Sequence, residues 1–176
     1  MYADDIILLS ASVTHLQMML DCCYNVGSEI CILFNVRKSN CMAIGPSFVD
    51  LSGANMRIGN IALQWVSKIK YVGIYLIAAK YFKVDLSEVR RKYFSSLNVI
   101  LSKCKYVSDP VKLKLVESHC LPILLYAIES LNIKKDELSS LNICWNAAYR
   151  NIFNFNKWES VKELICLMGR IDLKHM

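Results

Sequence analysis

The sequence predicts an α+β fold, in which short strands and one helix come first and only helices follow. Two observations predict this order. Short apolar runs separated by turn residues fill residues 1–79, whereas from Asp85 onward apolar residues recur every three or four positions. A third observation, a hydrophobic content of 55% and a mean hydropathy of +0.31, excludes a disordered chain. We therefore expect two domains, at residues 1–79 and 80–176.

The first expected elements are a buried strand and a helix. Ile6 to Leu9 is an unbroken apolar run, which predicts a short buried strand. Ser10 or Ser12 is a suitable N-cap for the helix that follows, and Gly27 is a suitable end. Its apolar positions are Val13, Leu16, Leu20 and Tyr24.

Several short strands are expected next. The runs Ile30 to Phe34 and Cys41 to Ile44 predict strands on either side of a polar connector, and Gly45-Pro46 ends the second. Gly59-Asn60 between two apolar segments predicts a hairpin of residues 56–58 and 61–65. Lys70 to Leu76 predicts a further strand, in which Gly73 indicates a bulge or a close backbone approach.

The second domain is expected to be helical throughout. The first helix begins near Asp85 and has one apolar face, made of Leu86, Val89, Tyr93, Leu97, Ile100 and Cys104. Asp109-Pro110 begins a second helix, which Pro122 should kink or divide. A third helix spans residues 136–152, and a shorter one runs from Trp158 to near Gly169.

The cysteines predict free thiols in a reducing compartment. None of the eight forms a Cys-x-x-Cys pair, and the three histidines fall at no zinc-ligand spacing. Most of the cysteines lie among Leu, Ile and Met, where a thiol acts as a small core residue. The N-terminus is acidic, unlike a signal peptide, and no apolar run approaches the ~20 residues of a membrane span. We expect an intracellular chain, in the cytoplasm or nucleus, without a membrane segment.

The net charge of +6 lies in one stretch of the sequence. Residues 80–114 carry nine Lys and Arg against three acids, and 9 − 3 = +6, whereas the flanking regions are each neutral. A basic stripe on one element is the electrostatic footprint expected for a phosphate backbone. The candidate contacts are Arg90, Arg91 and Lys92, although an exposed helix face in solvent has the same composition.

The sequence Tyr2-Ala3-Asp4-Asp5, just before the apolar run, indicates a metal site. Adjacent carboxylates on a turn provide the hard oxygen ligands that Mg²⁺ prefers, and nucleotidyl transfer uses two such ions. A solvated acidic turn beside a strand is the alternative interpretation.

The order of motifs resembles the C-terminal palm and thumb of non-LTR (LINE-type) retrotransposon reverse transcriptases. The resemblance covers essentially the whole chain. It rests on four segments: Tyr-Ala-Asp-Asp at 2–5, Phe-Asn-Val-Arg-Lys-Ser at 34–39, Lys-Tyr-Val-Gly-Ile at 70–74, and Ala148 to Val161. The resemblance implies a polymerase palm through residue 79 and an all-helical thumb after it.

The resemblance also implies roles for individual residues. Asp4 would bind the catalytic Mg²⁺ ions, Asp5 would assist it, and Tyr2 would lie beside the primer end and the incoming nucleotide. Lys38 would lie near the triphosphate. The partners of such an enzyme are an RNA template, a DNA primer and a deoxynucleoside triphosphate. A solvated loop lysine is an equal interpretation of Lys38.

Two further groups of residues would hold nucleic acid in such an enzyme. Residues 70–74 would form the primer grip, with Lys70, Tyr71 and Gly73 at the growing end. The basic residues 90–92 would follow the minor groove of the duplex. Tyr71 also fits an ordinary half-buried strand position.

One departure from the family concerns activity. Family enzymes have fingers and an earlier palm segment with another metal-binding aspartate, and this sequence begins one residue before Tyr2. We therefore expect a truncated RNA-directed DNA polymerase that is inactive alone, in which Mg²⁺ binding is weak or absent. The alternatives are a non-catalytic nucleic-acid-binding remnant using residues 85–105, a helical protein-interaction module of residues 108–170, or a chain that does not fold stably. The oligomeric state stays open.

Overall fold

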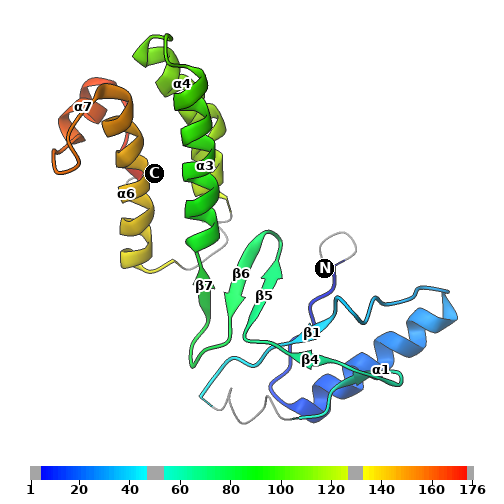
Figure 1. The fold of residues 1–176 in the computed structure, drawn as a ribbon. Helices are drawn as coiled ribbons and strands as arrows, with labels where there is room; N and C mark the ends of the chain where they lie inside the picture. The colour runs from blue at the N-terminus through cyan, green and yellow to red at the C-terminus, as the bar shows by residue number, and fades with distance from the viewer. Residues whose placement is uncertain (1–4, 47–53, 127–132, 174–176) are drawn as a thin grey trace. The chain divides into compact units, whose positions relative to one another are not determined.

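The computed structural model describes residues 5–46, 54–126 and 133–173, and the chain divides into two compact units (Figure 1). Unit 1 is Met1–Asp85 and unit 2 is Leu86–Met176. In the described residues, unit 1 contains one helix and seven short strands, whereas unit 2 contains helices only. The predicted α+β class is therefore correct. The division falls after strand β7 (Lys83–Asp85), which pairs with β6 and so belongs to unit 1.

Helix α1 (Val13–Glu29) begins where the sequence predicts but continues past Gly27. The Ser12 hydroxyl accepts a hydrogen bond from the backbone N–H of His15 at 3.2 Å, as an N-cap does. Gly27 has another role. A Cβ at this position would lie 2.7 Å from the Phe34 ring, so the glycine lets the returning chain lie against the helix.

Two predicted strands, at residues 6–9 and 30–34, are irregular instead. Ile6 and Ile7 are exposed, and 82% of Leu9 is accessible, so the first run is not a buried strand. In the second run, Ile32 donates its N–H to the Gly27 carbonyl at 2.8 Å. These backbone groups complete the C-terminus of α1 rather than a strand ladder.

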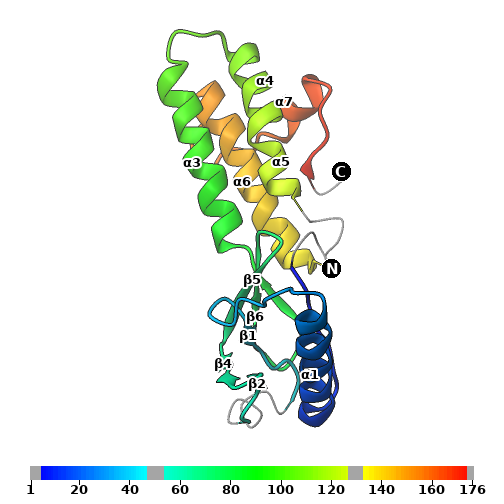
Figure 2. The ribbon, with the colours of Figure 1, turned by 90° about the vertical axis from the view of Figure 1, so that its right-hand side faces the viewer.

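Two short pairs of strands lie beside α1 (Figure 2). Strand β1 (Asn40–Cys41) is shorter than the predicted run to Ile44 and pairs in parallel with β4 (Gln64–Trp65). Strands β2 (Arg57–Ile58) and β3 (Ile61–Ala62) form the predicted hairpin around Gly59-Asn60. The Gln17 side chain bonds both the N–H and the carbonyl of Arg57, at 3.0 and 2.9 Å, and so attaches α1 to β2.

The core between these elements is small. Its buried residues are Cys41, Met56, Ile58 and Leu63, and half-buried Val13, Leu16, Leu20, Val36 and Trp65 pack against them. Three of the four apolar positions predicted for α1 therefore face this core, whereas Tyr24 is exposed, and α1 buries only Gly27 completely.

The rest of unit 1 is an antiparallel sheet of β5 (Lys68–Tyr71), β6 (Ile74–Ile77) and β7. The single strand predicted for Lys70 to Leu76 is wrong, because the chain reverses at Val72-Gly73. Both residues have positive φ, 46° and 81°, which is the geometry of a two-residue hairpin turn. Gly73 is therefore a turn residue and not a bulge inside a strand.

In its described residues, unit 2 is a bundle of five α-helices, whose arrangement Figure 2 shows. They are α3 (Ser87–Lys103), α4 (Asp109–His119), α5 (Leu121–Leu125), α6 (Lys135–Phe153) and α7 (Lys162–Leu167). Pro122 does divide the second predicted helix, into α4 and α5. The last helix is shorter than predicted, since it starts at Lys162 rather than Trp158.

One large core holds unit 2 together. Tyr93 and Leu97 from α3 lie on the predicted apolar face and are fully buried, as are Val116 and Trp145 from α4 and α6. The Trp145 ring meets the Tyr149 ring edge to face at 5.4 Å between centroids. Helical periodicity thus identified part of this core, whereas Cys144, Val161 and Ile165 were not predicted, and Cys104 was predicted on the apolar face but does not belong to the core.

The cysteines are all free, but fewer are buried than the sequence indicates. Cys41, Cys120 and Cys144 are core residues, whereas Cys22, Cys31 and Cys166 are exposed. No helix in the described residues is long and apolar enough to cross a membrane.

Candidate nucleic-acid interface

The acidic motif lies at the edge of the described chain. Tyr2 and Asp4 fall outside the described residues. Asp5 is an exposed β-bridge residue, directly before the irregular segment 6–10. Within the described residues, no group of three or more His, Cys, Asp or Glu side chains is placed to hold a metal ion. The donor set of two adjacent carboxylates still fits Mg²⁺, which takes one or two carboxylates together with phosphates and water.

Lys38 lies on a tight turn that its neighbours hold in place. The Asn35 carbonyl accepts hydrogen bonds from the N–H groups of Lys38 and Ser39, at 3.0 and 3.1 Å, and from the Ser39 hydroxyl at 3.0 Å. Phe34, packed on Gly27, fixes the start of this segment. The Lys38 side chain is exposed. The turn therefore fixes the Lys38 backbone while the ammonium group faces solvent.

The β5–β6 hairpin carries the residues expected at a primer grip. Lys70 is exposed opposite Tyr75, and its Nζ lies 5.9 Å from the centre of that ring. Lys68 Nζ approaches the same ring at 4.2 Å and pairs with Asp85. The hairpin therefore presents two lysines on one tyrosine, and sequence reasoning missed Lys68 and Tyr75.

The other two expected primer-grip residues are at the tip of the hairpin. Tyr71 is half-buried and lies opposite the buried Ile74. Gly73 is exposed in the turn, where the absence of a Cβ leaves the backbone open to close approach. Within the part of the chain that the structure describes, no hydrogen bond or ion pair joins Asp5, Lys38 and Lys70 to one another.

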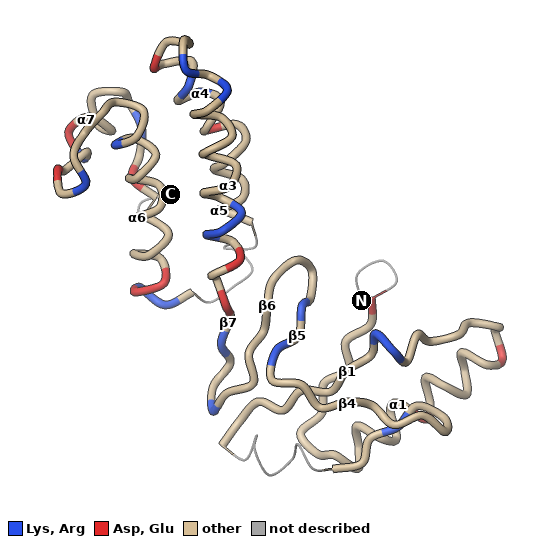
Figure 3. Tube along the Cα trace, viewed as in Figure 1, with Lys and Arg blue, Asp and Glu red and all other residues tan. Residues whose placement is uncertain are grey.

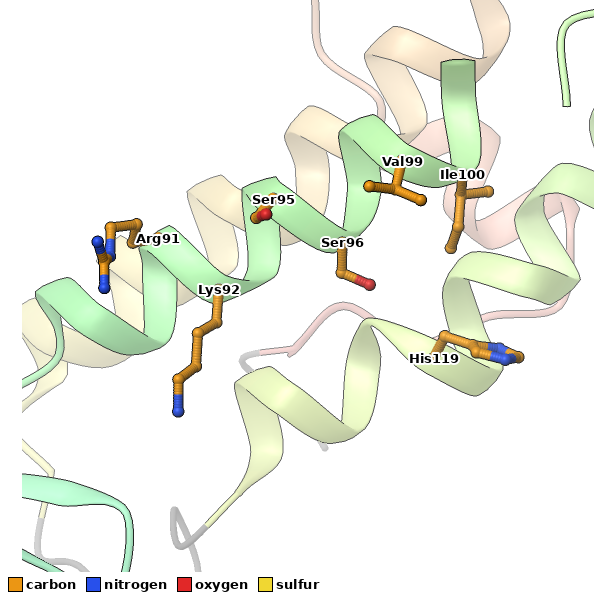
Figure 4. Close-up of a pocket in the computed structure, with 7 residues that line it drawn as sticks. All are labelled: Arg91, Lys92, Ser95, Ser96, Val99, Ile100 and His119. Atoms are coloured by element: carbon orange, nitrogen blue, oxygen red, sulfur yellow. The ribbon is translucent and has the colours of Figure 1, made fainter. Parts of the chain in front are cut away.

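The side chains of the three basic residues at the start of α3 lie in different surroundings. Arg91 is paired with Glu88, its Nη2 at 2.7 Å from the carboxylate. Burial raises the pKa of the Cys144 thiol, and the nearby Arg90 guanidinium acts in the opposite direction, so Arg90 lies toward α6. Lys92 projects toward the α4 side of the helix (Figure 4). Arg91 and Lys92 both line the groove described next, whereas Arg90 lies toward α6, and the prediction that the three contact nucleic acid together stays a prediction.

Lys92 lies at one end of an open groove between α3 and α4 (Figure 4). The groove has a volume of about 540 Å³ and is lined by Arg91, Lys92, Ser95, Ser96, Val99, Ile100 and His119. Ser96 and His119 were missed by sequence reasoning. The spacing of Lys92 and Ser96, four positions on one helix, is the signal that relates them.

The charge on α3, α4 and the turn between them is strongly positive. Residues 86–119 contain seven Lys and Arg and three acids, and 7 − 3 = +4. Figure 3 shows basic positions near both ends of α3. Each of the three acids already pairs with a cation: Glu88 with Arg91, Asp109 with Lys112 at 2.9 Å, and Glu117 with Arg170.

No protein-family model, curated protein or solved structure matches this chain. The motifs and the geometry described above are therefore the basis for a functional proposal. Unit 1 offers exposed residues on a turn and a hairpin tip, and unit 2 offers a cationic groove.

Proposed function

We propose that this chain is the palm and thumb portion of a non-LTR retrotransposon reverse transcriptase, an RNA-directed DNA polymerase. The observation that supports this proposal best is the order of two features. A tight hairpin carries Lys70, Tyr71 and Gly73, and the chain then continues through β7 into the basic helix α3. A grip for a primer end followed by a cationic helix suits a polymerase that holds a primer and its template.

Each residue would act on a different part of the substrate. Mg²⁺ bound by Asp4 and Asp5 would activate the primer hydroxyl and stabilise the leaving pyrophosphate. The Lys38 ammonium group, exposed on its turn, would contact the triphosphate. The Lys70 ammonium group would contact the primer phosphate, while the Gly73 backbone approaches the sugar.

Activity in this proposal needs the further metal-binding aspartate that family enzymes carry, and the described residues bring no three His, Cys, Asp or Glu side chains together. Two-metal catalysis requires ligands held within about 0.5 Å of the productive geometry. Asp5 is exposed and precedes an irregular segment, so its own surroundings do not provide that precision. We therefore expect that the 176-residue polypeptide binds primer–template but does not extend it.

Primer extension and binding together test the proposal. A labelled DNA primer on an RNA template is mixed with the polypeptide, Mg²⁺ and deoxynucleotides, and anisotropy reports binding at several salt concentrations. We expect salt-dependent binding that Lys70→Gln weakens, and no extension. Robust extension that Asp4→Ala abolishes would show that the polypeptide is active alone. Failure to bind any nucleic acid at low salt contradicts the proposal.

A second candidate is a non-catalytic nucleic-acid-binding protein, which the net charge of +4 over residues 86–119 favours. Substitution of the acidic motif distinguishes the two. Such a protein would not bind nucleotide in an Mg²⁺-dependent way, and Asp5→Asn would leave its nucleic-acid binding unchanged. A palm fragment should show weak Mg²⁺-dependent nucleotide binding that this substitution removes.

The helical protein-interaction module has less support. Ile143 on α6 and Leu167 on α7 are exposed, but most of the other apolar residues of these helices, including Leu141, Trp145 and Ile165, are buried in the core of unit 2. The buried residues are therefore not available to a partner unless unit 2 opens.

A further inference from the structure

The groove on unit 2 belongs to a longer stripe along α3 that carries two lysines and a serine, with Val99 and Ile100 between Ser96 and Lys103. Lys92, Ser96 and Lys103 are separated by four and seven positions, a spacing that aligns residues on one face of a helix. At 1.5 Å per residue, Lys92 and Lys103 are about 16 Å apart along the axis. A stacked strand with a rise of 3.4 Å per nucleotide covers this length with about five nucleotides.

The two lysines of this stripe have positive charge that nearby acids do not neutralise. The acids of α3 and α4 pair with Arg91, Lys112 and Arg170 instead. Neither Lys92 nor Lys103 forms an ion pair within the described parts of the chain, and both are exposed. An anionic ligand is the species that such a stripe attracts.

Ser96 provides a directed donor between the two lysines. The buried Cys120 thiol donates to the Ser96 oxygen at 3.3 Å, so the serine hydroxyl hydrogen is free to point elsewhere. Figure 4 shows the Ser96 hydroxyl projecting into the space between α3 and the helix that carries His119. A hydroxyl in this position can donate to a phosphate oxygen.

The stripe ends at an unusually exposed aromatic ring. Tyr106 lies in the turn after α3 and is fully exposed, with a relative accessibility of 102%. Exposed Lys103 and Lys105 lie beside it in the sequence. A ring that packs on nothing in the described structure, next to two cations, is the arrangement on which an unpaired base stacks.

We propose that this face of unit 2, which we call the α3 stripe, binds a single strand of nucleic acid. Lys92 and Lys103 contact phosphates, Ser96 donates to a phosphate oxygen between them, and Tyr106 stacks on a base. This second proposal rests on the proposed function and specifies that the partner at this face is a single strand. A paired duplex would use the lysines but would leave no base face for Tyr106.

Binding of the full chain to a labelled single strand of about ten nucleotides, and to the matching RNA–DNA hybrid, tests this proposal. The double substitution Lys92→Gln with Lys103→Gln should reduce the salt slope for the single strand by about 1.4 units. Tyr106→Ala should weaken single-strand binding roughly 5- to 100-fold, and hybrid binding much less.

Two variants elsewhere in unit 2 provide matched controls. Lys162→Gln removes an exposed lysine from α7, and Trp158→Ala removes another highly exposed aromatic ring. Both should leave single-strand binding unchanged. Unchanged circular dichroism and melting of every variant would show that the bundle is intact.

The outcomes separate this proposal from the one it rests on. If the chain binds nucleic acid but the substitutions in the α3 stripe have no more effect than the controls, the stripe is overturned and the polymerase proposal stands. Binding to the hybrid alone, with Tyr106→Ala silent, has the same meaning. If no nucleic acid binds at low salt, both proposals fail.

Discussion

Unit 1 and unit 2 are similar in length but differ greatly in how much apolar surface they bury. The largest core cluster in the described part of unit 2 contains sixteen buried residues, and the corresponding cluster in unit 1 contains four. Leu33 in unit 1 remains 91% accessible, and Ile6, Ile7 and Leu9, on the other side of α1 in the sequence, are exposed as well. Since apolar burial is the dominant favourable term in folding, we expect unit 2 to be much the more stable.

The residues proposed to act in each unit follow the same division. In unit 1 they lie on a turn and a hairpin tip, both held by local hydrogen bonds. In unit 2 they lie on α3, a 17-residue helix whose opposite face is part of the large core. The geometry of the α3 stripe therefore depends on a stable scaffold, whereas the geometry of the catalytic motif depends on a marginal one.

The largest expected effect concerns the core of unit 2. Trp145→Ala should lower the free energy of unfolding of unit 2 by about 4 kcal/mol, because the fully buried indole leaves a large cavity. Urea unfolding followed by circular dichroism measures this change. Trp158→Ala, at an 87% accessible site, should change it by less than about 0.5 kcal/mol. Equal effects of the two substitutions would contradict the assignment of the core.

The stability of unit 2 should also decrease at alkaline pH. Burial raises the pKa of Tyr149 to about 12, and the nearby Glu117 carboxylate adds to this effect. The unfolded tyrosine ionises near pH 10, so its contribution to stability is complete below pH 10 and is lost as the pH rises toward 12. The loss attributable to this residue should be about 2 kcal/mol.

Tyr149→Phe is the matched control for that prediction. The Tyr149 hydroxyl has no hydrogen-bond partner in the described residues, so the substitution should change stability little at pH 7. Melting temperatures of both proteins between pH 8 and pH 12 measure the difference. The melting temperature should decline less in the variant. Part of the decline should remain, because burial also raises the pKa of Tyr93. Identical declines would show that Tyr149 is not buried as described.

A smaller effect is expected at the junction that holds Lys38 in unit 1. Gly27→Ala places a Cβ against the Phe34 ring, and the resulting overpacking should exceed the helix-propensity gain by about 1 kcal/mol. Hydrogen exchange of α1 amides should become faster while α3 amides stay protected. The double variant Gly27→Ala with Phe34→Leu should recover part of the loss. Faster exchange in both units would mean that they do not unfold separately.

The smallest expected effect concerns Arg91. Its ion pair with Glu88 is on the surface, where such pairs contribute 0–1 kcal/mol, so Arg91→Gln should hardly change the melting temperature. Nucleic-acid binding should also decrease less than with Lys92→Gln, because Arg91 is already paired and Lys92 is not. Equal losses of affinity would restore the simpler prediction that residues 90–92 act together.

Local rules predicted some elements of unit 1 correctly and failed at others. Gly59-Asn60 specifies its hairpin because the turn needs positive φ at Gly59, which has φ of 56°. Gly73 was placed inside a strand, since Val72 before it is β-branched and rarely adopts the positive φ that it has here. The run at residues 30–34 has strand composition, yet its backbone completes α1.

In the candidate site, the residue types were predictable but their partners were not. Five of the nine Lys and Arg of residues 80–114 lie outside α3, and four lie on it: Arg90, Arg91, Lys92 and Lys103. Whether Arg90, Arg91 or Lys92 is available depends on Cys144, Glu88 and the α4 side of the groove, which are contacts made by other turns and helices. The sequence does not predict the role of Tyr106, because no local pattern indicates that its ring is fully exposed.

The sequence by itself determined the α+β order, the approximate positions of the helices of unit 2 and the buried face of α3, because helical periodicity is a local pattern that a packed bundle stabilises. Tertiary structure alone decided that the runs at residues 6–9 and 30–34 are not strands. It also decided that, of the two basic residues lining the groove, Arg91 pairs with Glu88 whereas Lys92 forms no ion pair within the described residues. A strand exists only if another segment supplies its hydrogen-bond partners, and a charge is available only if no neighbour pairs with it. Both conditions depend on residues far away in the chain.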